Sequence, residues 1–231
     1  CAREVHAVRT GCGINELQNF GKFAITGKGA RNWLNTIMAG RIPAIGRMSL
    51  TPMLSPNGRL LGDFTVSCLA EGNFQLTASY GAQEIHYRWF MKHLKGDVRV
   101  RNVSDRRTGF QIAGPKSREI LSRCTRDDVA AIRFLDVRRM TIGQVDCTVQ
   151  RVSYTGDLGY EIYCEPMDQR QLWQTLWNAG QPLDITPFGM RAMMSLRLDR
   201  HFGSWLSEFS PDYTAAETGM DRFINFKKPD D

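Results

Sequence analysis

Two segments of this chain have similar sequences, and this similarity constrains the fold more than any other feature. ITGKGARNWLNTI begins at Ile25 and IAGPKSREILSRC begins at Ile112, and both carry Ile, Gly, Arg and Leu at the same offsets. A match this short can arise by chance, but the elements predicted on either side follow the same order. We therefore expect a duplicated α+β fold, with related halves at residues 1–97 and 98–186 and a C-terminal segment at 187–231. A ligand between two such halves is a natural expectation.

The spacing of apolar residues predicts the elements of each half. In the first half we expect a helix at residues 2–10, a strand at 20–26, a helix after Gly29, a meander over 48–54, 60–69 and 74–79, and a helix at 82–94. In the second half we expect a strand at 107–113, a helix from 117, strands at 141–153 and 159–165, and a helix at 168–179, and in the C-terminal segment we expect a helix at 188–200.

The composition excludes several classes of protein. No apolar run is long enough to cross a bilayer, so we expect a soluble protein without a membrane partner. The net charge of +6 favours anionic partners, but the basic residues are dispersed, which argues against a nucleic-acid track. The six cysteines and four histidines form no pair at ligand spacing, so we expect free, buried thiols and no metal site.

A turn followed by an acidic strand occurs at residues 154–162, with the sequence YTGDLGYEI. Glycine and aspartate favour a turn at 155–159, and the chain then extends. Because side chains alternate along a strand, Glu161 and Tyr163 face one side, while Tyr160, Ile162 and Cys164 face the other. Glu161 is either a surface residue on a half-exposed strand or a buried carboxylate, which needs hydrogen-bond donors such as two adjacent N–H groups of a ligand.

A second acid, Asp63, lies in the segment GRLLGDFTV. Alternation places Leu61, Asp63 and Thr65 on one face of the predicted strand and the more apolar residues on the other. An acid in this position can stabilise a developing cation or accept a proton. The alternative is that Asp63 lies close to a turn and caps backbone amides by accepting their hydrogen bonds.

The segments MSLTPMLSPNGRLLGDFTV, AGPKSREIL, YTGDLGYEI, PFGMRAMMSLRLD and GMDRFINFKK occur in this order from residue 48 to residue 228. Together they resemble the folate-binding region of the dimethylglycine and sarcosine dehydrogenase family, which is related to the aminomethyltransferase, or T-protein, of the glycine cleavage system. The likeness extends over nearly the whole chain. It implies two duplicated α+β subdomains around a central channel that binds tetrahydrofolate.

The resemblance also implies roles for individual residues. Asp63 matches the main catalytic acid, which would stabilise a cationic intermediate and assist proton movement. Glu161 matches a glutamate that holds the pterin ring by its N–H edge, and Tyr154 matches a tyrosine beside the folate. Phe20 matches an apolar residue of the folate-binding wall.

Three positions depart from the T-protein pattern. Gly62 stands where T-protein has the first of two consecutive acids, and Thr77 stands where it has an asparagine. The T-protein arginine falls at Met193, two residues after Arg191, and two helical residues turn a side chain by about 200°. Arg191 is therefore an uncertain substitute for binding the folate tail. These departures favour the methylamine dehydrogenase branch.

The resemblance implies a module that captures a methylene or formaldehyde unit from a methylated amine, such as dimethylglycine or sarcosine, and forms 5,10-methylenetetrahydrofolate. The alternatives are a T-protein-like aminomethyltransferase and a non-catalytic folate-binding protein. FAD is expected only in a missing domain or a partner chain, and the small barrel that follows this region in the family is expected to be absent. The implied compartment is a bacterial cytoplasm or the mitochondrial matrix.

Overall fold

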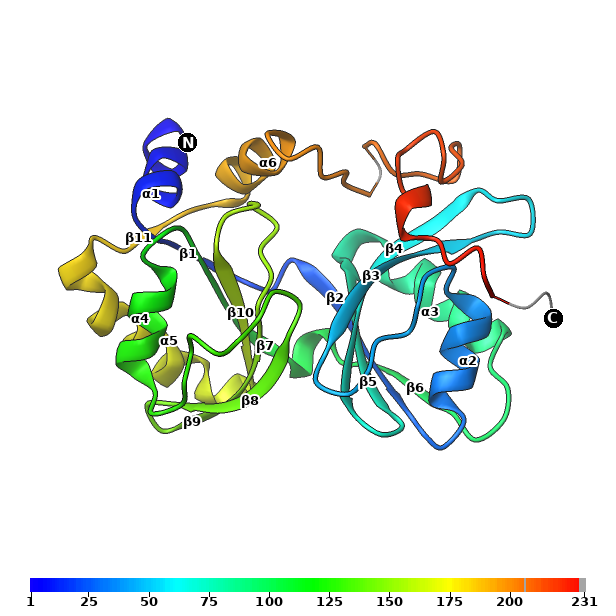
Figure 1. Ribbon diagram of the computed structural model, residues 1–231, viewed down its shortest axis with the longest axis horizontal. Coiled ribbons are helices and arrows are strands. Elements are labelled where there is room, and N and C mark those ends of the chain that lie inside the picture. The colour runs from blue at the N-terminus through cyan, green and yellow to red at the C-terminus, as the bar shows by residue number, and fades with distance from the viewer. Residues whose placement is uncertain (206, 229–231) are drawn as a thin grey trace. The chain divides into compact units, whose positions relative to one another are not determined.

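Two β-sheets, one in each of two units, organise the chain (Figure 1). The computed structural model describes residues 1–205 and 207–228. Unit 1 consists of residues 1–18 and 105–202, and unit 2 consists of residues 19–104 with the chain from Gly203 onward. The expected α+β class is confirmed. The expected division into halves at 1–97 and 98–186 stays a prediction, and residues 206 and 229–231 of the C-terminal segment lie outside the described residues.

Unit 1 contains a six-stranded sheet in the order β11-β1-β7-β10-β9-β8. All neighbouring strands in it are antiparallel except β1 and β11. Its strands are β1 (Gly13–Glu16), β7 (Thr108–Ala113), β8 (Val137–Ile142), β9 (Val145–Gln150), β10 (Gly159–Cys164) and β11 (Thr186–Pro187). Its helices are α1 (Ala2–Thr10), α4 (Ser117–Cys124), α5 (Gln169–Gly180) and α6 (Met190–Leu198).

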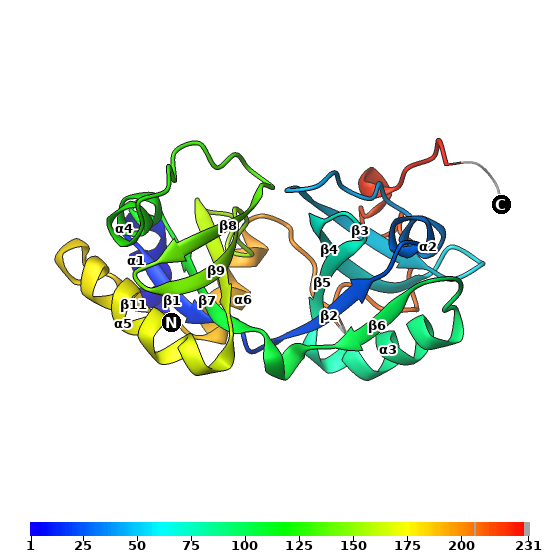
Figure 2. The same cartoon turned by 90° about the horizontal axis from the view of Figure 1, so that it is seen from below.

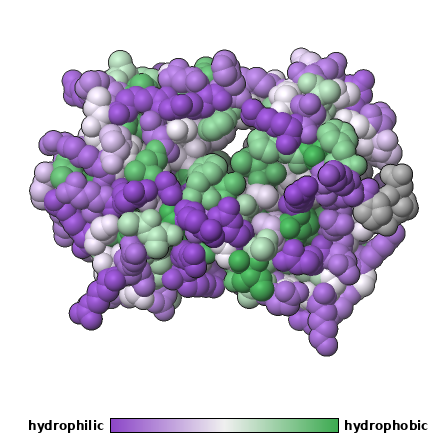
Figure 3. Space-filling view, viewed as in Figure 1, coloured by the Kyte–Doolittle hydropathy of each residue, from purple (hydrophilic) through white to green (hydrophobic). Residues whose placement is uncertain are grey.

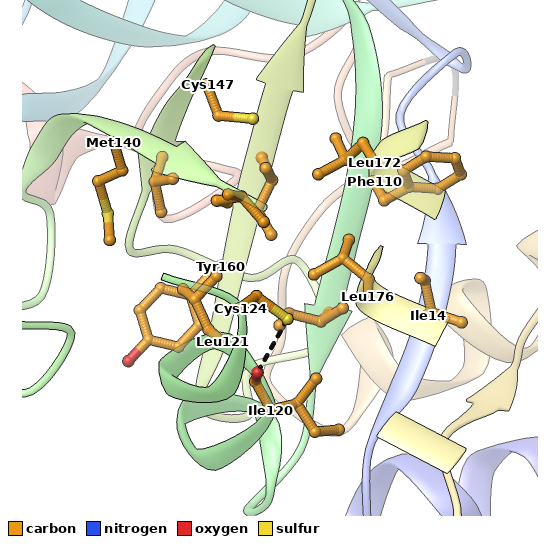
Figure 4. Close-up of a cluster of buried hydrophobic side chains, with 14 of the residues drawn as sticks. Ile14, Phe110, Ile120, Leu121, Cys124, Met140, Cys147, Tyr160, Leu172 and Leu176 are labelled. Carbon is orange, nitrogen blue, oxygen red and sulfur yellow. Dashed lines mark hydrogen bonds between the residues drawn. The ribbon is translucent and has the colours of Figure 1, made fainter. Parts of the chain in front are cut away.

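The apolar core of unit 1 lies on one face of this sheet. Alternate residues of β7, β9 and β10, among them Ile112, Val149 and Ile162, are buried there with residues of α4 and α5. Figure 4 shows Tyr160 of β10 in this cluster, together with side chains of α4 such as Leu121. Because successive side chains of a strand point to opposite faces, the residues between them, including Glu161, lie on the other face.

Unit 2 contains a five-stranded antiparallel sheet in the order β3-β4-β5-β2-β6. Its strands are β2 (Phe20–Thr26), β3 (Met48–Leu54), β4 (Leu60–Ala70), β5 (Asn73–Ser79) and β6 (Arg99–Asn102), and its helices are α2 (Ala30–Ile37) and α3 (Gln83–Lys92). Figure 2 gives a second view of this sheet with its helices. Apolar residues of β2, β4 and β5 form one core with Trp33 and Leu34 of α2 and Phe90 of α3.

The two similar segments have the same local structure. In each, a central strand ends at a glycine with positive φ, 127° at Gly27 and 129° at Gly114, and a helix follows. A Cβ atom at Gly27 would lie 2.1 Å from the Asp97 carbonyl oxygen, and one at Gly114 would lie 2.4 Å from the Gly11 carbonyl oxygen. Both the φ angle and the close approach of backbone therefore require glycine at these positions.

The sequence-based prediction of one strand over residues 141–153 was wrong. β8 ends at Ile142 and β9 covers residues 145–150, and the two strands are joined by a turn at Gly143 with φ 62°. The short strands β1 and β6 were also missed. Each of these two strands has only four residues, too few for a clear apolar pattern.

Hydrophilic residues cover most of the face of the molecule seen in Figure 3, as expected from the charge content of the chain. Within the described residues, no helix combines the length and the apolar character that a membrane span requires.

The first prediction concerns the close packing of His86 against Gly62. A Cβ atom at Gly62 would lie 2.6 Å from His86 Nε2 and 2.7 Å from Phe64 Cε2, both in the packed interior. We expect Gly62→Ala to lower the free energy of unfolding by about 1–3 kcal/mol through overpacking. Chemical denaturation measures this change. Gly81→Ala is the control, since a Cβ there meets nothing within 4 Å, and it should change stability by less than about 1 kcal/mol.

The pKa of His86 generates the second prediction. The Nε2–H of this fully buried ring donates to the Leu61 carbonyl oxygen at 3.0 Å, while burial lowers the His86 pKa from 6.5 to about 4. The unfolded chain therefore binds a proton more readily than the folded chain does. The resulting stability is present above pH 6.5 and is lost as pH falls toward 4. We expect a loss of about 2–3 kcal/mol over this range, which the variant His86→Leu does not undergo. Equal pH dependence of the two proteins in denaturation experiments would contradict this assignment.

Candidate functional site

Glu161 lies at the centre of a strand that is buried along its whole length. All six residues of β10 are buried, and only 8% of Glu161 is exposed. The surface alternative for this residue is therefore wrong. Tyr163, on the same face of the strand, donates its hydroxyl to Glu161 Oε2 at 2.7 Å. This hydrogen bond fixes the orientation of the carboxylate.

Glu161 belongs to a row of polar side chains that crosses the sheet of unit 1. Its partner in β7 is Gln111, its partner in β9 is Gln150, and Gln111 is paired in turn with Asn15 of β1. Residues directly opposite each other in an antiparallel sheet share a face, so all four side chains lie on the face opposite the apolar core. We name Gln111, Glu161 and Gln150 the amide–carboxylate row.

Both glutamines of the amide–carboxylate row are buried and incompletely hydrogen-bonded. Gln111 is 1% exposed and Gln150 is 0% exposed. Gln111 Nε2 lies 3.2 Å from Asn15 Oδ1 and 3.0 Å from Met193 Sδ. Gln111 Oε1 and both amide atoms of Gln150 have no partner among the described residues. Buried polar atoms in native proteins are normally hydrogen-bonded, so these three atoms indicate a position for a polar ligand or water.

The turn that precedes β10 positions Tyr154. Ser153 Oγ accepts from the Thr155 amide at 3.2 Å, and the Ser153 carbonyl oxygen accepts from the Gly156 amide at 3.2 Å. The half-buried Tyr154 ring stacks on Phe202, with centroids 6.2 Å apart. The turn is therefore an ordered element.

Arg9 of α1 connects this turn to the end of α6. Its Nη1 lies 2.6 Å from Asp157 Oδ2, and its Nη2 lies 2.8 Å from Asp199 Oδ2. Nη1 also donates to the Thr155 carbonyl oxygen at 3.3 Å. Arg9 thus holds three separate parts of unit 1 together through charge-assisted hydrogen bonds.

Arg191 and Met193 occupy different surroundings on α6. Arg191 is exposed, whereas Met193 is buried with its sulfur against Gln111. Met193, the position at which the resemblance implies an arginine, thus contacts the amide–carboxylate row, while Arg191 itself has no described contact with that row.

Asp63 is the fourth residue of β4 and is paired with Pro52 of β3. The burial pattern confirms the predicted alternation, since Leu61, Asp63 and Thr65 are half-buried and the residues between them are buried. Burial raises the Asp63 pKa from 3.8 to about 6, against a smaller lowering by its own backbone amide. Within residues 1–205 and 207–228, no turn amide is hydrogen-bonded to this carboxylate, which does not support the capping alternative.

Phe20 and Thr77 lie on the same face of the unit 2 sheet as Asp63. Thr77 of β5 is paired with Thr65 on one side and with Lys22 on the other, and Phe20 precedes Lys22 by two residues. Phe20 is half-buried, whereas Thr77 is buried and its Oγ1 has no partner in the described part of the chain. This face is therefore polar and partly unsatisfied, as is the corresponding face in unit 1.

The buried cysteine thiols are poor candidates for a reactive site. Five of the six free cysteines are buried. Burial raises the pKa of Cys12 and Cys147 to about 12 and that of Cys124 and Cys164 to about 11, so these four groups are weak nucleophiles. The described residues contain no cluster of three or more His, Cys, Asp or Glu side chains that could hold a metal ion.

The structure groups the predicted site residues by unit. Asp63, Phe20 and Thr77 share one face of the unit 2 sheet, while Glu161 lies in the sheet of unit 1, with Tyr154 in the turn before β10 and Arg191 on α6. Sequence reasoning missed Gln111 and Gln150. A signal was present, because each is a polar residue within an apolar strand segment, FQIA and CTVQ. The pairing of these strands with β10 was needed to connect them to Glu161.

Residues 1–228 match the family model of the GCVT N-terminal domain. The mitochondrial dimethylglycine dehydrogenase of Rattus norvegicus is 35% identical over 224 residues, which cover 95% of this chain and 26% of that protein. An aminomethyltransferase of Clostridium botulinum (strain Loch Maree / Type A3) is 31% identical over 233 residues, which cover 99% of this chain and 63% of that protein.

The crystal structure of the glycine cleavage system aminomethyltransferase T from Bartonella henselae has a TM-score of 0.87 and 21% identity, covering 97% of this chain and 60% of that one. This likeness shows the fold. The chain spans 26% of the dehydrogenase and 63% of the Clostridium aminomethyltransferase. The resemblance found in the sequence is confirmed, and the chain belongs to the family of GCVT N-terminal domains.

Proposed function

We propose that this chain binds tetrahydrofolate and transfers a one-carbon unit to it, forming 5,10-methylenetetrahydrofolate. The observation that carries the proposal is Glu161, a buried carboxylate whose orientation is fixed by Tyr163 on a face lined with unsatisfied amides. A buried carboxylate of this kind is suited to a ligand that presents adjacent N–H donors. The reduced pterin of tetrahydrofolate has such an edge in its 2-amino group and the neighbouring ring N–H.

The residues present fit this ligand. The acceptor oxygens of Glu161 match N–H donors, and the unsatisfied atoms of Gln111 and Gln150 provide further donor and acceptor capacity in the same row. Tyr154 is the proposed aromatic neighbour of the folate. Phe20, Thr77 and Arg191 stay candidates for folate contacts, and the exposed Arg191 is suited only to an anionic part of the ligand that reaches solvent.

Tetrahydrofolate supplies nucleophilic amine nitrogens that take up the one-carbon unit. Asp63 is the proposed catalytic acid. Since its pKa is raised to about 6, the carboxylate is ionised at pH 7 but remains close to the pH at which it exchanges a proton. It can therefore stabilise a positive charge that develops beside it and accept a proton.

The proposed one-carbon donor is a methylated amine, such as dimethylglycine or sarcosine, after its oxidation. The sequence similarity to a dimethylglycine dehydrogenase over 95% of this chain supports this donor class. Oxidation of such an amine requires an electron acceptor, so the proposal includes a flavin domain or flavin partner. A bacterial cytoplasm or the mitochondrial matrix is the corresponding compartment.

A T-protein-like aminomethyltransferase is the second candidate, supported by 31% identity to the Clostridium protein over 99% of this chain. The two functions can be distinguished by the one-carbon donor that each uses. Product formation with an oxidised methylated amine supports the first candidate, and product formation only with an aminomethylated carrier protein supports the second.

The role of Asp63 yields the third prediction. We expect Asp63→Asn to reduce the rate of 5,10-methylenetetrahydrofolate formation by about 100-fold or more, because the charge and the proton acceptor are lost. Tetrahydrofolate affinity should change by less than about threefold, since the proposed pterin contacts remain. Product assays and calorimetric titration measure the two quantities. A normal rate in this variant would exclude the catalytic role.

The same substitution should stabilise the free protein. The folded-state pKa of Asp63 is above its ordinary value, so ionisation destabilises the fold as pH rises from about 4 to about 6. At pH 7 we expect Asp63→Asn to raise the free energy of unfolding by about 1–3 kcal/mol. Asp146→Asn, at an exposed strand position, is the matched control and should alter neither stability nor rate.

The role of Glu161 yields the fourth prediction. Glu161→Gln keeps the size of the side chain but replaces a charged acceptor with a neutral amide. We expect tetrahydrofolate affinity to fall by roughly 10- to 100-fold, the usual effect of losing hydrogen bonds to a charged group. Glu16→Gln, an exposed change in β1 of the same sheet, is the control. Unchanged affinity in Glu161→Gln would refute the assignment of the pterin to this carboxylate.

A further inference from the structure

The two glutamines that flank Glu161 are unusual because each keeps at least one buried amide atom without a hydrogen-bond partner in the described part of the chain. Gln150 is fully buried at the end of β9, and neither its Nε2 nor its Oε1 has a partner among residues 1–205 and 207–228. An unpaired buried amide destabilises a protein by about 1–3 kcal/mol. A methionine or leucine of similar volume would avoid this cost. The position therefore carries a side chain that the free protein alone does not favour.

We propose that Gln150 and Gln111 recognise the heterocycle held by Glu161, with Gln150 donating to its ring carbonyl and Gln111 accepting from a further N–H group. This inference rests on the proposed function and adds two residues to it. The ligand class is a 2-amino-4-oxo pteridine, in which the carbonyl, the ring N–H and the amino group follow one another along one edge.

The register of the sheet supports this assignment. Gln150 and Gln111 are the direct cross-strand partners of Glu161 on either side. Adjacent strands lie about 4.8 Å apart, so three neighbouring side chains form a short linear array of hydrogen-bonding groups. Such an array can form hydrogen bonds with a planar heterocycle that carries donors and an acceptor along one edge.

The contacts of the two amides assign their roles. Gln111 already uses Nε2 with Asn15 Oδ1 and Met193 Sδ, so its remaining capacity is the acceptor Oε1. Gln150 has both atoms available and can supply the donor that a carbonyl needs. Glu161 cannot donate when ionised. Gln150 is therefore the residue of the row best suited to a ring carbonyl.

The test uses the variant Gln150→Met and two measurements on the purified protein. Calorimetric titration with tetrahydrofolate should show a Kd that is about 10- to 100-fold higher, because the ring carbonyl of the bound ligand loses the donor that Gln150 supplies. Chemical denaturation without ligand should show that the variant is at least as stable as the unsubstituted protein. A purely structural role for Gln150 predicts lower stability instead, so that result, or an unchanged Kd, would overturn the proposal.

Gln144→Met is the control. Gln144 belongs to the same unit, but it is exposed in the turn between β8 and β9 and lies outside the amide–carboxylate row. Its substitution should leave the Kd unchanged, and an equal loss of affinity in both variants would overturn the assignment. If the unsubstituted protein fails to bind tetrahydrofolate, the proposed function fails. If it binds and Glu161→Gln weakens binding while Gln150→Met does not, only the role of Gln150 fails.

Discussion

The burial of polar groups on one face of each sheet is the constraint on which the rest of the structure depends. In both units, helices cover the opposite face and bury an apolar core. The polar face includes Glu161 in unit 1 and Thr77 in unit 2, both buried. Folding such a surface is unfavourable unless each group finds a partner. Tyr163 donates a hydrogen bond to Glu161, whereas the amide atoms of Gln150 have no partner among the described residues. A ligand that supplies these hydrogen bonds would stabilise the folded state by binding it selectively.

At Asp63, the raised pKa that suits the residue to chemistry also lowers the stability of the folded protein. A carboxylate with a pKa raised to about 6 destabilises the folded protein at neutral pH, and an asparagine would relieve this effect. The neighbouring His86 is arranged in the opposite way. Its pKa is lowered to about 4, so it stays neutral and serves as a packing residue against Phe64. The two residues lie within one unit, yet only the acid carries charge at pH 7. Strand β4 therefore has a polar face, which carries Asp63 and can contact a ligand, and an apolar face, which packs in the interior of unit 2.

Much of this arrangement could be predicted from the sequence, because alternation along a strand is a local property. The faces of β4 and β10, and hence the same-strand residues that share a face with Asp63 and Glu161, followed from spacing alone. What could not be predicted depends on distant parts of the chain. The surface and buried alternatives for Glu161 differ only in what covers the strand, and the sequence of β10 is compatible with both. Gln111 and Gln150 lie far from Glu161 in the chain and become its neighbours only through strand pairing. The single strand predicted over 141–153 failed for a local reason, since the turn at Gly143 interrupts an otherwise continuous strand-like pattern.

The departures from the T-protein pattern have physical counterparts in the packing. Gly62 stands where the resemblance implies the first of two acids, and an ideal Cβ there would lie 2.6 Å from His86 Nε2. An acid at residue 62 would thus collide with a buried imidazole, so the single acid at Asp63 is coupled to the presence of His86. Met193 stands where the resemblance implies an arginine, and its sulfur accepts from Gln111. A cation at residue 193 would lie beside Gln111 Nε2, which is a donor and not an acceptor. The Met193 thioether is a weak acceptor and therefore suits this position. Residues 62 and 193 are therefore each coupled to a neighbouring residue, so we expect substitutions at these two positions to act together with changes at His86 and Gln111.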